Sequence, residues 1–102
     1  MAELIVTPLA HEDLSHVVSY IAVNLSNPDA ADTFLDDVDE CYVHMRENPR
    51  MYAFCTDTRL LLLQYRKAVI GNYVLIHRYD ETTDTVIVLR CFYVAQDYVK
   101  LL

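Results

Sequence analysis

Apolar residues in the first half of the chain recur at the spacing of amphipathic helices. After Thr7-Pro8, a capping residue followed by a proline at the first helical position, one apolar stripe comprises Leu14, Val17, Val18, Ile21 and Leu25. Asn27-Pro28 repeats this start signal, and a second stripe comprises Ala31, Phe34, Leu35, Val38, Cys41, Tyr42 and Met45. The short link between the two segments predicts an αα-hairpin that ends at Asn48-Pro49, with Phe34 and Leu35 buried at its centre.

The second half of the chain has the pattern of a β-meander. β-rich runs cover residues 65–70, 73–79 and 85–93, with Gly71-Asn72 and the polar residues 80–84 between them. We expect residues 50–59 to be a loop and the apolar run 60–63 to open the next strand. The run 85–93 is apolar on both faces, which predicts a central strand. Residues 4–6 are a further β-prone run, and nothing marks a boundary within a single domain of residues 1–102.

Charge divides the chain into two unequal halves. Residues 1–45 hold nine acids and no lysine or arginine, whereas residues 46–102 hold all eight basic residues and six acids; charges of −9 and +2 give the net −7. This balance argues against specific DNA binding by the chain alone. Three cysteines without metal-ligand spacing, no secretory signal and no long apolar run predict a cytoplasmic protein with no membrane span, metal or cofactor.

The order of motifs in the last third resembles the RelE/ParE superfamily of bacterial toxins from type II toxin–antitoxin pairs. It reads "YRK", then "GNY" and a tyrosine, an acidic turn, an apolar strand, an aromatic residue and "QDY..LL". The resemblance implies an α+β fold of order β-α-α-β-β-β, a helical hairpin packed on a mostly antiparallel four-stranded sheet. Residues 4–6 would join the sheet edge, and the sheet face away from the helices would remain a shallow concave surface.

The resemblance also implies where catalysis would lie. The nuclease branch of the superfamily uses cations on the concave face, and the matching positions here hold Val74 and Gln96. The remaining candidates for catalysis are Arg66, Arg78, Arg90 and Tyr93. The missing cations favour a ParE-like toxin that inhibits a protein target such as DNA gyrase. The alternatives are a RelE-like, ribosome-dependent mRNA interferase and a non-toxic homologue that only binds an antitoxin.

The same residues also have plain structural interpretations. The arginines are then surface charges of a sheet, with Arg90 opposite Arg78 across the strand pair or balanced by Asp97. His77, which alternation places on the helix-covered face, is then a core histidine with a hydrogen-bonded partner. The tyrosines near the C-terminus then pack against the core.

The resemblance finally implies a partner, an antitoxin of the ribbon-helix-helix or helix-turn-helix type. We expect it to cover apolar residues of the concave face, because an uncovered apolar patch usually marks an interface. The residues predicted to bind the antitoxin or the target are Val74, Ile76, Arg78, Tyr93 and Tyr98.

Overall fold

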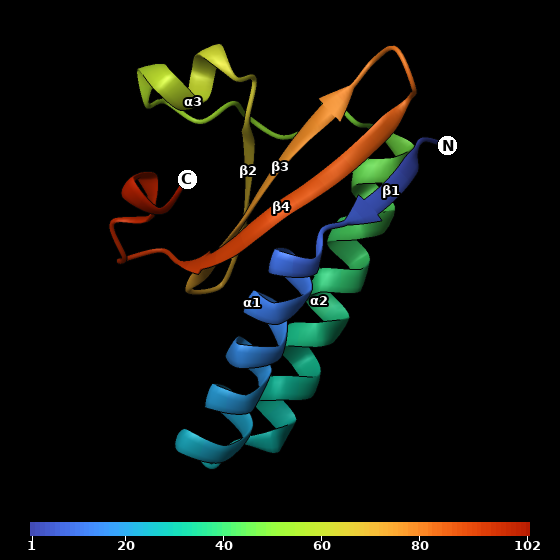
Figure 1. Cartoon of the computed structure of the whole chain (residues 1–102). Coiled ribbons are helices and arrows are strands. Elements are labelled where there is room, and N and C mark those ends of the chain that lie inside the picture. The colour runs from blue at the N-terminus through green and yellow to red at the C-terminus, as the bar shows by residue number, and fades with distance from the viewer.

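The computed structural model describes all residues 1–102 (Figure 1). The elements follow in the order β1 (Glu3–Val6), α1 (Pro8–Ser19), a π-helical turn η1 (Tyr20–Asn24), α2 (Pro28–Glu47), α3 (Thr58–Leu62), β2 (Arg66–Ile70), β3 (Tyr73–Asp80), β4 (Thr85–Tyr93) and a 3₁₀ turn η2 (Tyr98–Leu101). The predicted α+β fold, a helical hairpin against a mostly antiparallel four-stranded sheet, is confirmed. None of the helices combines the length and apolarity that crossing a bilayer requires.

The sheet has the strand order β1-β4-β3-β2. β4 pairs antiparallel with β3 and parallel with β1, which makes it the predicted central strand, and β1 is an edge strand. The β3–β4 register shifts at one point, where Ile76 pairs with Arg90 but His77 pairs with Val88. Leu89 is therefore an extra residue in β4, a bulge of the kind that bends and twists a strand.

The helical hairpin covers one face of the sheet, with α1 and α2 side by side along their length (Figure 1). Both helices begin as predicted: Thr7 Oγ1 accepts a hydrogen bond from the Ala10 N–H, and Asn27 Oδ1 accepts one from the Ala30 N–H. The main core between these layers includes Leu14, Phe34, Val38, Met45, Leu75, Val86 and Val88. Leu35 was predicted to be buried, but its 40% exposure shows that the stripe of α2 runs through Phe34 alone at this turn.

A second, smaller core lies on the opposite face of the sheet. It joins Cys55, Leu60, Val74, Ile76 and Phe92, and it is covered by α3 and the C-terminal turn, which Figure 1 shows close together. The run 60–63 therefore does not open a strand as predicted. Asp57 accepts hydrogen bonds from the N–H groups of Arg59 and Leu60, and this cap starts a helix where the apolar run alone suggested a strand.

Candidate functional site

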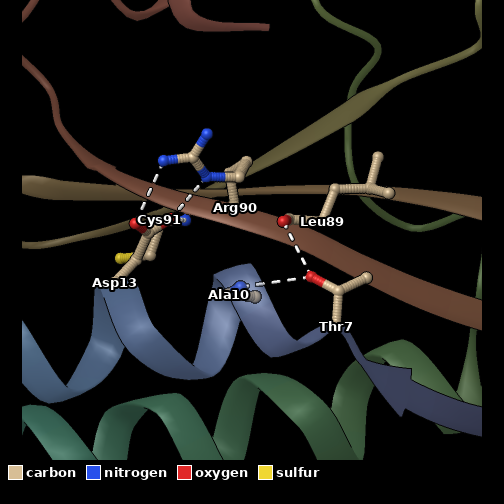
Figure 2. A network of polar contacts seen from close by, with 6 residues as sticks. All are labelled: Thr7, Ala10, Asp13, Leu89, Arg90 and Cys91. Carbon is tan, nitrogen blue, oxygen red and sulfur yellow. Dashed lines mark hydrogen bonds and ion pairs between the residues drawn. The ribbon is translucent and has the colours of Figure 1, made fainter.

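The first half of α1 takes the place of a strand beside β4. β1 ends at Val6, and Thr7 then donates its N–H to the Val88 carbonyl at 3.0 Å and its hydroxyl to the Leu89 carbonyl at 3.0 Å. The same hydroxyl accepts the Ala10 N–H at the helix start, as Figure 2 shows. One threonine thus caps α1 and fixes its first turn against the bulge in β4.

Asp13, one helical turn and a half further on, completes this junction. Its Oδ2 accepts the Cys91 N–H at 3.0 Å and the Arg90 Nε at 2.7 Å, and its Oδ1 accepts from Arg90 Nη2 at 3.1 Å (Figure 2). The side chains of Arg90 and Asp13 are only 23% and 15% exposed. Because the two parallel hydrogen bonds fix both partners in one geometry, they hold α1 at a set distance from β4.

A groove of about 550 Å³ opens directly beside this ion pair. One wall comes from α1 and the turn that follows it, and the other from the β2–β3 turn, the end of β4 and the C-terminal segment. Its lining includes His16, Val17, Tyr20, Leu25, Asn72, Tyr73, Cys91, Phe92, Tyr93, Gln96 and Leu101. Four large side chains of this lining are about half exposed, namely Tyr20, Leu25, Tyr93 and Leu101. The groove therefore offers apolar surface with a few polar groups, as binding sites do.

Arg90 belongs to this groove, but the structure corrects its predicted partner. It lies opposite Ile76 rather than Arg78, and its charge is balanced by Asp13, whereas Asp97 pairs with Lys100 at 3.4 Å on the surface. The hydrogen bonds to Asp13 raise the pKa of Arg90. Its guanidinium also lies 4.7 Å above the ring centre of Phe92.

Arg66 lies elsewhere and holds the loop before α3. Its Nη1 donates to the carbonyl of Tyr52 at 2.6 Å and to that of Arg50 at 3.3 Å, and its guanidinium lies 3.9 Å from the ring centre of Phe54. It pairs across the strands with His77, on the helix-covered face. Burial is the largest cause that lowers the pKa of Arg66.

Arg78 is separated from the other candidates, whereas Tyr93 shares the groove with Arg90. Arg78 is half-buried, pairs with Ile87 across β3 and β4, and takes part in none of the ion pairs of the structure. Tyr93 lies at the far end of β4, on the rim of the groove, 5.8 Å from the ring of Tyr73. Of the four predicted catalytic side chains, Arg90 and Tyr93 thus line the same groove, while Arg66 and Arg78 lie elsewhere on the sheet.

His77 is a core residue, as predicted, but without the predicted hydrogen-bonded partner. Its side chain is fully buried, and neither ring nitrogen has a partner. The ring packs edge-on against Tyr52 at 5.6 Å. Burial lowers the pKa of His77 to about 4, because the charged form loses its hydration.

The predicted open apolar surface on the concave face is not present. Val74 and Ile76 are 2% and 0% exposed, because α3 and the C-terminal turn cover them. Tyr98 is part of this cover, stacked on Phe92 at 5.5 Å with the rings nearly parallel. Of the predicted contact residues, Tyr93 is exposed, whereas Arg78 and Tyr98 are partly buried.

The sequence prediction missed most of the groove. Tyr20 is an apolar residue outside the stripe that packs α1 against the sheet, and it is 49% exposed. Val23, also outside the stripe, is 71% exposed. Large apolar residues on helix faces that should be polar were the sequence signal that could have revealed the groove.

Burial raises the pKa of all three cysteines, to about 12 for Cys91, so these thiols are poor nucleophiles.

The fold is that of a small α+β protein in which a helical hairpin covers a four-stranded sheet. The family described as the ParE toxin of the type II toxin–antitoxin system, parDE, matches residues 4–98. The chain belongs to this family. No curated protein sequence matches the chain.

Two solved structures are similar to the chain. One, from the chromosomal ParDE toxin–antitoxin system of P. aeruginosa, has a TM-score of 0.72 and 19% identity, with 92% of this chain and 97% of that chain covered. The other is from the RelBE2 toxin–antitoxin complex of Mycobacterium tuberculosis, with a TM-score of 0.49, 22% identity, and 90% and 96% covered. At this identity, the first likeness supports the fold.

Proposed function

We propose that this chain is the toxin of a ParDE-like module, held inactive by a cognate antitoxin and acting on a protein target such as DNA gyrase. The observation that carries the proposal is the placement of the cations. Cleavage of RNA by its own 2′-hydroxyl needs cations gathered at the scissile phosphate together with a general base. Arg66 lies on the opposite face of the sheet from Arg78 and is bound to loop carbonyls, and Arg90 is bound to Asp13, so neither guanidinium is free to join Arg78 at one phosphate.

We propose that the antitoxin binds in the groove beside Asp13; this groove is called the antitoxin seat below. Tyr20 and Leu25 on one wall and Tyr93 and Leu101 on the other are about half exposed around an interior of about 550 Å³. Exposed apolar side chains around a hollow favour a partner that inserts its own apolar residues. An antitoxin of the ribbon-helix-helix or helix-turn-helix type would supply these from the segment outside its DNA-binding fold.

The antitoxin seat is tested with charged substitutions on the rim. Tyr20→Asp and Leu101→Asp each place a charge in the proposed interface, and we expect them to abolish co-purification with the product of the small reading frame next to the gene. Val43→Asp is the matched control, because Val43 is 46% exposed on α2 and lies outside the groove. Loss of the complex in the control, or its survival in both rim variants, would refute this seat.

The target is tested with two assays of the purified chain. We expect it to trap the DNA cleavage complex of gyrase and to leave mRNA intact on programmed ribosomes. Codon-dependent cleavage that disappears in Arg78→Ala would establish the RelE-like alternative, since Arg78 is the candidate arginine without an ionic or hydrogen-bonded partner. Normal growth on induction without the antitoxin would establish the non-toxic homologue.

A further inference from the structure

The outer edge of β2 is paired along only part of its length. Residues 53–55 run beside its beginning: the Cys55 N–H donates to the Tyr65 carbonyl at 2.8 Å, and the Lys67 N–H donates to the Ala53 carbonyl at 3.0 Å. Because successive residues of a strand present their polar groups to opposite sides, Val69 presents its N–H and carbonyl to the same outer edge as Lys67. Beyond residue 67, no part of the chain continues this pairing.

The open part of this edge lacks the devices that usually protect one. Edge strands are protected by charged side chains, prolines, bulges or a covering element. Lys67 stands where residues 53–55 already cover the edge, whereas Val69 is an apolar, β-branched residue with 63% exposure. The remaining edge is therefore fit to accept another strand.

An acidic hollow lies beside this edge on the helix side of the sheet. It measures about 260 Å³ and is lined from α2 by Asp37, Glu40, Cys41 and His44 and from the other side by Tyr52, Val69, Ile70 and Gly71. Asp37, Glu40 and His44 recur at helical spacing, so α2 presents them along one stripe. No lysine or arginine lines the hollow. Both carboxylates belong to exposed residues and lack a salt bridge.

Side chains alternate between the two faces of β2, and this alternation decides which surface would lie next to each side chain of an added strand. Ala68 and Ile70 face the helices, whereas Val69 faces away from them. A strand added about 4.8 Å from β2 would place alternate side chains over the hollow and the others beside the exposed Val69. Basic side chains fit the first position and apolar ones the second.

We propose that the β2 edge at Val69 and the hollow beside Asp37 and Glu40 together bind an extended, basic segment of a partner protein as a fifth strand. Main-chain hydrogen bonds to Val69 supply the affinity, and the two carboxylates select for alternating lysine or arginine. This site is separate from the groove beside Asp13, and the proposal depends neither on the toxin's target nor on the antitoxin seat.

The test uses the full chain and labelled hexapeptides that alternate valine with lysine or valine with glutamate. We expect the lysine peptide to bind by fluorescence anisotropy and to shift the amide NMR signals of Val69 and Gly71. A lysine peptide methylated on the backbone nitrogens that face β2 keeps every charge but cannot form the strand ladder, and we expect it not to bind. This control leaves the protein unchanged, so a folding defect cannot explain its result.

The charge selection is tested with paired variants of α2. Asp37→Asn with Glu40→Gln removes both carboxylates of the hollow, and we expect about tenfold weaker binding of the lysine peptide. Asp32→Asn with Asp36→Asn removes the same charge from α2 outside the hollow and is expected to change binding less than about twofold. Equal binding of the glutamate peptide or of the methylated peptide, or signals that move only at the groove or at β1, would overturn the proposal, as would the absence of binding.

Discussion

Asp13 and Arg90 are 77 positions apart in the sequence, yet they form a two-pronged ion pair that fixes α1 to β4. The carboxylate also accepts the Cys91 N–H, which lies on the edge of β4 that β1 has left. One side chain thus closes a strand edge, neutralises an arginine and sets the width of the neighbouring groove.

The first prediction concerns this pair. Asp13→Ala leaves the Arg90 charge and the Cys91 N–H without partners in a largely enclosed place, and we expect a loss of about 1.5–3 kcal/mol in the free energy of unfolding. Urea denaturation followed by circular dichroism measures it. His11→Ala is the control on the same helix, because His11 is exposed and should change stability by less than about 0.5 kcal/mol. A similar small loss for Asp13→Ala would mean that the pair contributes nothing.

The second prediction uses two neighbours on α2. Phe34 is 6% exposed and packs edge-on against Tyr73 at 5.3 Å, whereas Leu35 is 40% exposed. Phe34→Ala should therefore cost about 3–5 kcal/mol, and Leu35→Ala less than about 1 kcal/mol. Equal losses in the same urea experiment would show that α2 does not turn Phe34 toward the sheet and Leu35 toward solvent.

The sequence predicted those features that depend on local signals. Thr7-Pro8 and Asn27-Pro28 marked both helix starts, and the apolar character of residues 85–93 marked the central strand. Each signal acts within a few residues of its effect, so a pattern along the chain is enough to read it.

The features that were missed depend on contacts between distant segments. The apolar run 60–63 is ambiguous by itself, and the cap at Asp57 together with burial of Leu60 against Val74 and Ile76 decides for a helix. The partner of Arg90 could not be chosen from the sequence, because fifteen acids compete and only the fold brings Asp13 near. Phe34 and Leu35 differ in exposure because the sheet covers only part of the apolar stripe.

The third prediction concerns pH. The buried His77 has a pKa of about 4, against a usual value of 6.5, so the unfolded chain binds more protons between these values. Stability should therefore fall as pH decreases through this window, by about 2 kcal/mol between pH 7 and pH 5. Urea denaturation at the two pH values measures this loss of unfolding free energy. In His77→Leu the loss should be about 2 kcal/mol smaller than in the parent protein. The same pH dependence in both proteins would show that His77 does not cause it.

The last prediction concerns the segment that covers the second core. Arg59 on α3 donates hydrogen bonds from Nη2 to the Val99 carbonyl and from Nη1 to the Leu102 carbonyl, while Tyr98 stacks on Phe92. Arg59→Ala removes the attachment to α3 but leaves the stacking and the core residues in place. We expect faster amide hydrogen exchange in residues 98–102, with the exchange of β3 and β4 unchanged, because this segment would open locally while the sheet stays folded.

Thr58→Ala is the control for this change. Thr58 is an exposed neighbour in α3 that makes no side-chain hydrogen bond to the C-terminal segment. Its exchange in residues 98–102 should match that of the parent protein. Unchanged exchange in Arg59→Ala would mean that the stacking of Tyr98 alone holds the segment, whereas faster exchange of β3 as well would mean that the segment and the sheet open as one cooperative unit. Unchanged exchange would therefore show that Tyr98, and not Arg59, holds residues 98–102 over the second core.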